Sequence, residues 1–92
     1  MKSEFELPYS ADLPAALLAL ADSQGFQCEE HPLASRPQDR HWHVRKPNQP
    51  GTIEITWQPI ERRTLLIVRA NRRGKWSDEE IQALSDALKA QS

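Results

Sequence analysis

Apolar and polar residues alternate with the two-residue period of a β-strand along the middle of the chain. The alternation runs through residues 41–46 and 52–58, and a third run, 64–70, is apolar on both faces at its centre. A segment rich in proline and polar residues, 47–51, separates the first two runs, which is typical of a hairpin turn. Successive side chains of a strand point to opposite faces, so the three runs predict an antiparallel meander.

A helical spacing of apolar residues marks a helix over residues 13–24, where leucines and alanines share one face. Asp12 is the expected N-cap, and Pro14 falls in the first turn, where its missing N–H costs little. Gly25 suits the left-handed position that ends many helices. Each of these residues favours the same helix boundaries.

The C-terminal helix carries the strongest local signal of the chain. Ser77 and Glu80 have the spacing of a capping box, and Trp76 and Ile81 have that of a hydrophobic staple. We expect loss of the Ser77 hydroxyl to cost about 1 kcal/mol of stability. Gly74, in the turn before this helix, is expected to adopt a positive φ.

The remaining segments complete one α+β domain over residues 1–92. Residues 1–10 contain a short alternating stretch that fits an extended edge segment, residues 26–30 fit a weak strand, and residues 32–40 form a polar loop. The predicted fold is a two-layer sandwich: an antiparallel three- to four-stranded meander sheet with two helices on one face, in α-β-β-β-β-α order.

Leu65 and Ile67 make the second face of the last strand apolar. A strand with two apolar faces is usually central or covered on its far side. Two explanations stay open: residues 5–9 cover the pair, or the pair forms an exposed patch that receives a partner.

Charge is segregated along the chain although its total is near zero. Lys and Arg number 12 and Asp and Glu 13, giving a net charge of −1. The charge is −5 over residues 1–35, +7 over 36–75 and −3 over 76–92. A basic middle between acidic ends gives the folded surface a polarity, which selects partners.

Composition and motifs exclude several classes of protein. Cys28 is the only cysteine, so an intrachain disulfide is impossible and a reducing, cytoplasmic location is the expectation. The apolar run over residues 13–21 is shorter than a bilayer span requires, so no membrane association is predicted. The chain has three glycines and no recognisable catalytic or phosphate-binding motif. We therefore expect no cofactor, no catalytic residues and no enzymatic activity.

Four residues have side chains that ligate metals: Cys28, His31, His41 and His43. Their spacing matches no common zinc motif, and alternation places Cys28 and His31 on opposite faces of their strand. The sequence therefore predicts no metal site.

The sequence favours a small binding module that uses one face of its sheet. The expected partner is a protein, most simply a second copy of the chain, because the acidic ends of one copy can meet the basic middle of another. Nucleic-acid binding is the alternative, although Trp42 and Trp57 are expected on the core face, where they cannot stack on bases. The candidate binding residues are Arg45, Arg63, Arg69, Arg72, Arg73, Lys75, His41, His43, Leu65 and Ile67.

Overall fold

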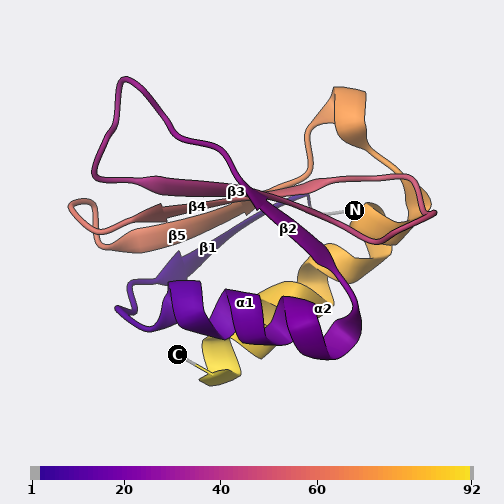
Figure 1. Ribbon diagram of the computed structural model, residues 1–92, viewed down its shortest axis with the longest axis horizontal. Coiled ribbons are helices and arrows are strands. Elements are labelled where there is room, and N and C mark those ends of the chain that lie inside the picture. The colour runs from indigo at the N-terminus through magenta and orange to yellow at the C-terminus, as the bar shows by residue number, and fades with distance from the viewer. Residues whose placement is uncertain (1–2, 92) are drawn as a thin grey trace.

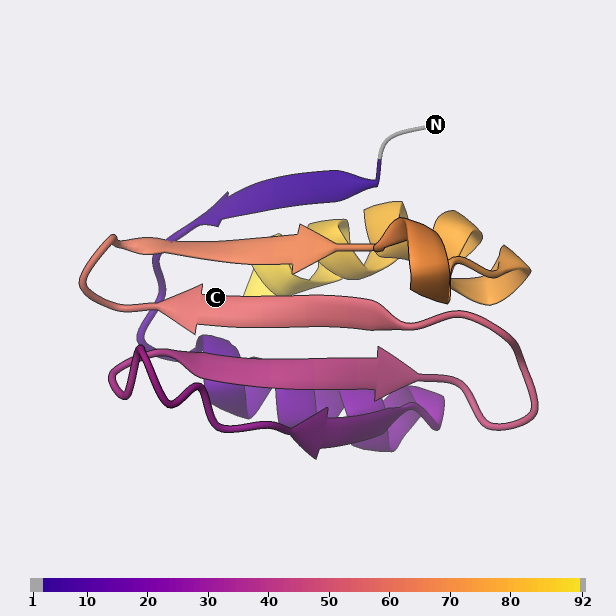
Figure 2. The same ribbon diagram turned by 90° about the horizontal axis from the view of Figure 1, so that it is seen from above.

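The chain forms a five-stranded antiparallel sheet with two α-helices packed on one of its faces (Figure 1). The structure is a computed structural model, and it describes residues 3–91. The elements follow one another as β1 (Glu4–Pro8), α1 (Leu13–Gln24), β2 (Gln27–Glu30), β3 (Arg40–Arg45), β4 (Ile53–Gln58), β5 (Arg63–Ile67), the 3₁₀ turn η1 (Ala70–Arg72) and α2 (Lys75–Gln91). Across the sheet the strands lie in the order β1-β5-β4-β3-β2 (Figure 2).

The predicted α+β sandwich with both helices on one face is confirmed, and the predicted number of strands was too low. The sheet has five strands because β1 pairs with β5 along its whole length, from Glu4 opposite Ile67 to Pro8 opposite Arg63. The chain order therefore begins with a strand. β1 provides hydrogen-bond partners that β5 would otherwise lack on that side. Within the described residues, neither helix is long and apolar enough to cross a bilayer.

The core lies between the helices and the inner face of the sheet. Trp42 on β3 is 1% exposed, which agrees with its predicted inward orientation, whereas Trp57 on β4 is only partly buried. Fully buried aliphatic residues come from both layers: Leu13 and Leu17 of α1, Ile81 and Leu88 of α2, and Val44, Ile53, Ile55 and Leu66 of the sheet. The alternation read from the sequence is thus the alternation between the core and the outer face.

The predicted end of α1 is confirmed, and so is the predicted N-cap position of Asp12, although its side chain does not cap the helix. Gly25 has φ 73° and a left-handed conformation, and its N–H bonds to the Ala21 carbonyl. Asp12 stands at the N-cap position, but its side chain makes no capping hydrogen bond. Its φ of −89° and ψ of −1° are close to helical values, whereas a capping side chain usually needs an extended residue.

The predicted start of α2, with Ser77 as the N-cap, was three residues too late. The helix begins at Lys75, so Ser77 lies inside the first turn and is fully buried. Its Oγ accepts a hydrogen bond from the Gly74 N–H and donates one to the Gly74 carbonyl, both at 3.1 Å. The Ser77–Glu80 capping box is therefore wrong, because the hydroxyl turns back to the residue that precedes the helix.

The expectation of a positive φ at Gly74 is also wrong. The described glycines with positive φ are Gly25 and Gly51. A side chain at Gly74 would place its Cβ 2.3 Å from the carbonyl oxygen of Pro50, so glycine is needed there for close approach of two backbones. The Thr52 N–H also donates to the Arg72 carbonyl at 3.0 Å. These contacts hold η1 against the β3–β4 loop.

Candidate functional site

The outer face of the sheet lies opposite both helices, and within the described residues the loop between β2 and β3 and the turn η1 lie on its side (Figure 1). The strand register arranges its side chains in rows. One row contains Ile67, Glu54 and His43, and the next contains Leu65, Thr56 and His41. Residues far apart in the sequence therefore lie side by side on this face. The candidate binding residues from β3 and β5 fall on opposite sides of β4.

Three histidines and one carboxylate gather on this face over β2, β3 and β4. The Nε2 atom of His41 lies 3.5 Å from Oε1 of Glu54, and Nδ1 of His41 is hydrogen-bonded to the Thr56 hydroxyl at 2.7 Å. The His43 ring centroid is 5.1 Å from that of His41 and 4.2 Å from that of His31. We call His31, His41, His43 and Glu54 the histidine–glutamate cluster. His41, His43 and Glu54 each offer one potential ligand atom, and these three atoms lie within 4.8 Å of one another.

Two arginines contact the cluster. Arg69 Nε donates to Oε1 of Glu54 at 3.0 Å, and Arg72 Nη1 donates to Nδ1 of His43 at 3.1 Å. The Glu54 side chain is 7% exposed, whereas that of Arg69 is 57% exposed. The carboxylate is thus held within the face, while the guanidinium groups that contact the cluster reach it from the solvent side.

The electrostatics of the face favour neutral histidine rings. Burial lowers the pKa of both His41 and His43, and the neighbouring His31 and Arg72 act in the same direction. The negative charge of Glu54 raises the pKa of both rings, but by less than the other contributions lower it. At neutral pH each ring therefore presents a nitrogen lone pair.

Glu54 is the residue of this site that the sequence interpretation missed. Alternation already placed it on the same face as His41 and His43, but cross-strand neighbours depend on register. The pairing of Glu54 with His43 puts the carboxylate at the centre of the cluster. The signal available in the sequence was the alternation of each strand, which assigns all three residues to the face away from the core.

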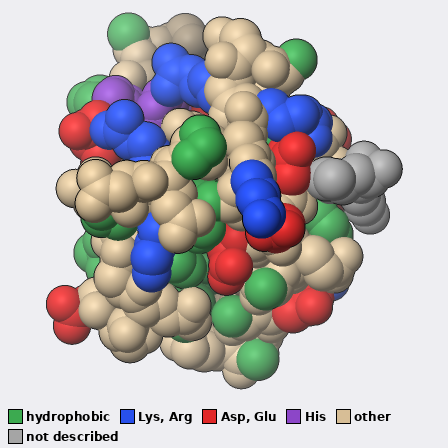
Figure 3. All heavy atoms as spheres, turned by 90° about the vertical axis from the view of Figure 1, so that its right-hand side faces the viewer, with side chains coloured by type: hydrophobic (Ala, Val, Ile, Leu, Met, Phe, Trp, Pro, Cys, Tyr) green, Lys and Arg blue, Asp and Glu red, His purple; other side chains and the backbone are tan. Residues whose placement is uncertain are grey.

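Much of the basic middle of the chain is neutralised within the molecule. At least five of its ten cations form ion pairs with carboxylates of the same chain: Arg36, Arg40, Arg63, Arg69 and Arg73. In the space-filling view, acidic side chains lie close to several Lys and Arg side chains, and basic side chains also lie beside the histidines (Figure 3). The outer face is therefore mixed in charge, and its cations are less available to phosphate than the sequence suggested.

The predicted binding residues do not form one patch. Leu65, at the middle of β5, and Ile67, at its end, are half-buried, and β1 lies beside them in the sheet without covering them. The explanation in which residues 5–9 cover this pair is wrong, because β1 pairs edge to edge with β5. Arg45 is exposed at the end of β3, and Lys75 is exposed at the start of α2.

Cys28 lies apart from the cluster. It packs against the hydrophobic core, so the predicted separation of Cys28 and His31 between the two faces holds. Burial raises the pKa of the Cys28 thiol to about 11, and the charge of Glu30 adds to the increase. The thiol is protonated at neutral pH.

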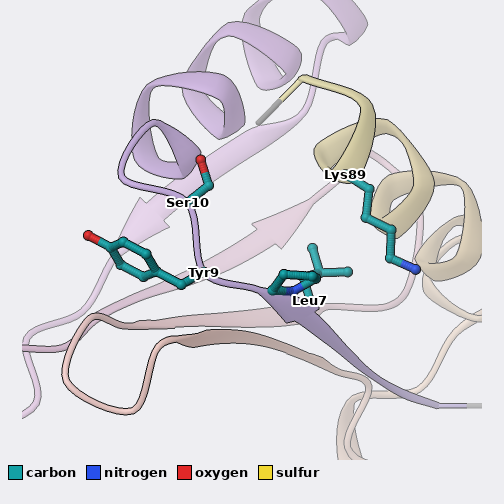
Figure 4. A pocket seen from close by; sticks show the side chains of 5 residues that line it. Leu7, Tyr9, Ser10 and Lys89 are labelled. Atoms are coloured by element: carbon teal, nitrogen blue, oxygen red, sulfur yellow. The ribbon is translucent and has the colours of Figure 1, made fainter.

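A second feature lies at the far end of the sheet. The Arg62 guanidinium lies 4.2 Å from the ring centroid of Tyr9, which in turn stacks on Trp57 at 5.8 Å. A cavity of about 330 Å³ adjoins this stack, and Lys89 reaches toward it from α2 (Figure 4). Its lining consists of Leu7, Pro8, Tyr9, Ser10 and Lys89. No predicted site residue lines this cavity.

Comparisons with known proteins give no relative: no family model, curated protein or solved structure matches this chain.

Proposed function

We propose that this domain is a non-enzymatic binding module, and that the outer face of its sheet receives a protein partner, in the simplest case a second copy of the chain. The observation that carries the proposal is the face of the sheet that neither helix covers, which includes the half-buried Leu65 and Ile67 of β5. An uncovered sheet face that includes apolar side chains is a common site of protein contact.

The charge distribution across this face supports self-association. Exposed Glu4 and Glu6 lie on β1, at one side, while exposed Arg45 lies on β3, toward the other side. A two-fold axis parallel to the strands places β1 of one copy over the opposite side of its partner. Each copy then offers carboxylates to the cations of the other.

The size of the face indicates a weak dimer. Five strands about 4.8 Å apart and about 17 Å long present about 400 Å² per copy. The buried total of about 800 Å² is below the roughly 1,200–2,000 Å² of stable complexes. Self-association should therefore depend on concentration and weaken as salt screens the carboxylate–arginine contacts.

Sedimentation velocity over a wide range of concentrations, at low and at high salt, tests the proposal. We expect a monomer–dimer equilibrium at low salt that Ile67→Lys abolishes. Leu18→Lys is the matched control, because Leu18 is 48% exposed on α1. A monomer at every concentration in both salts, or equal effects of the two variants, would contradict self-association. A gel shift with RNA or DNA at low salt would favour the nucleic-acid alternative.

A further inference from the structure

We propose that His41, His43 and Glu54 form a binding site for one divalent transition-metal ion of the zinc class. The proposal goes beyond the binding function of the face and does not require a second copy of the chain. Imidazole nitrogens and a carboxylate oxygen are ligands that Zn²⁺ accepts in proteins. Potential ligand atoms of these three residues already lie within 4.8 Å of one another.

The hydrogen bond of His41 orients its ring for this role. When Nδ1–H donates to the Thr56 hydroxyl at 2.7 Å, Nε2 is unprotonated and lies 3.5 Å from Oε1 of Glu54. Two acceptors that face each other at this distance repel unless a proton or a cation lies between them. Two ligand atoms of a tetrahedral zinc ion are separated by about 3.3 Å when each is about 2.0–2.1 Å from the metal. A polar partner on the second ring nitrogen is also what metal-ligating histidines usually have.

The sheet provides a rigid support for the three side chains. His43 and Glu54 are directly paired across β3 and β4, and His41 lies two residues from His43 on the same face. Glu54 is 6% exposed, so its carboxylate has little freedom to leave the face. Ligands on neighbouring strands of one sheet are held more precisely than ligands on loops.

His31 is placed to assist but lies outside the group of three. Its ring lies tilted at 31° against that of His43, and its Nε2 is 2.8 Å from Oε1 of Glu29 without a hydrogen bond of good geometry. A solvent molecule can complete the coordination of three protein ligands. Replacing His31 should therefore weaken binding less than replacing His43.

Arg69 and Arg72 compete with the metal ion. Arg69 occupies Oε1 of Glu54, and Arg72 occupies the lone pair of Nδ1 of His43. Both residues are exposed, so both guanidinium groups can swing into solvent. Their charges also repel a divalent cation. The structure thus makes an unusual prediction: removing an arginine next to the site should tighten metal binding.

Isothermal titration calorimetry of the untagged, chelator-treated full chain with Zn²⁺ at pH 7.5 tests the proposal. We expect one Zn²⁺ per chain, no response to Mg²⁺ or Ca²⁺, and intense visible absorption when Co²⁺ replaces Zn²⁺. Arg72→Ala should lower the Zn²⁺ dissociation constant about tenfold, because a neighbouring unit charge is removed. His43→Gln and Glu54→Gln should raise it by about 100-fold or more, since even outer-shell changes commonly cost 10–100-fold.

Two controls keep the outcome interpretable. Cys28→Ser should leave the Zn²⁺ affinity unchanged, because Cys28 lies toward the core. If the ligand variants unfold, the Zn²⁺ affinity of Arg72→Ala still tests the proposal, since Arg72 is exposed and its loss should preserve the fold. Absence of Zn²⁺ binding to both the parent chain and Arg72→Ala overturns the proposal. So does a ratio of one ion per two chains. A monomer that binds one Zn²⁺ would support this site while contradicting self-association.

Discussion

Gly74 lies against the backbone of Pro50 and Gly51, and its replacement gives a quantitative test. An alanine Cβ there would lie 2.3 Å from the carbonyl carbon and oxygen of Pro50 and 2.6 Å from the nitrogen of Gly51. All three are backbone atoms, so the β3–β4 loop must move away from the start of α2. The displacement also strains the Thr52–Arg72 hydrogen bond.

The expected cost follows from these contacts. Overpacking of this kind costs about 1–3 kcal/mol, and loss of one backbone hydrogen bond adds about 1 kcal/mol. Gly74→Ala should therefore lower the free energy of unfolding by about 2–4 kcal/mol. For a domain of this size that corresponds to a fall in Tm of about 10–25 °C, which thermal unfolding followed by circular dichroism can measure.

Gly25 is the matched control, because it requires glycine for a different reason. Its φ is 73°, and the nearest atom to an added Cβ is Lys46 Nζ at 3.8 Å. Gly25→Ala should cost only about 1–2 kcal/mol, and asparagine, which tolerates the left-handed region, should cost less than alanine. At Gly74, asparagine should be no better than alanine. A wild-type Tm for Gly74→Ala, or rescue of that position by asparagine, would refute the close-approach argument.

Three further predictions concern other parts of the chain. Ser77→Ala should cost about 1–3 kcal/mol in urea unfolding, because it leaves buried backbone groups of Gly74 without their hydroxyl partner. With a chelator present, the free energy of unfolding should fall as the pH drops below 6.5. The pKa values of His41 and His43 are lowered in the folded chain, so the unfolded chain takes up protons at a higher pH than the folded one. An unchanged free energy of unfolding between pH 7 and 5 would contradict this. Cys28, with a thiol pKa of about 11, should react with iodoacetamide at pH 8 far more slowly in the folded chain than in urea.

Local patterns predicted the elements and their inward faces well. The helix over residues 13–24 and the inward orientation of Trp42 follow from periodicity and end signals that act within a few residues. Asp12 occupies its predicted N-cap position without a capping hydrogen bond, and the predicted capping box at Ser77 is wrong, for one shared reason. A side chain caps a helix only if the backbone before it adopts the required conformation, and tertiary contacts of the neighbouring loop decide that conformation.

The candidate site was predictable only in part. The sequence placed His41, His43 and Glu54 on one face, yet it left their proximity undetermined. The sequence also suggested a basic surface, because it does not show which arginines are paired with carboxylates. Arg69 and Glu54 are 15 positions apart, and their ion pair forms only because β4 and β5 pair in the sheet. Arg72 reaches His43 because the Gly74–Pro50 contact holds η1 in place.

The amino-acid sequence by itself determined both helices, the central strands and the side of each that faces the core, because these depend on the spacing of apolar residues along the chain. Only the tertiary structure decided which side chains meet on the outer face. Register and loop packing are set by contacts between distant segments, and a shift of one residue would turn His43 toward the helices and away from Glu54.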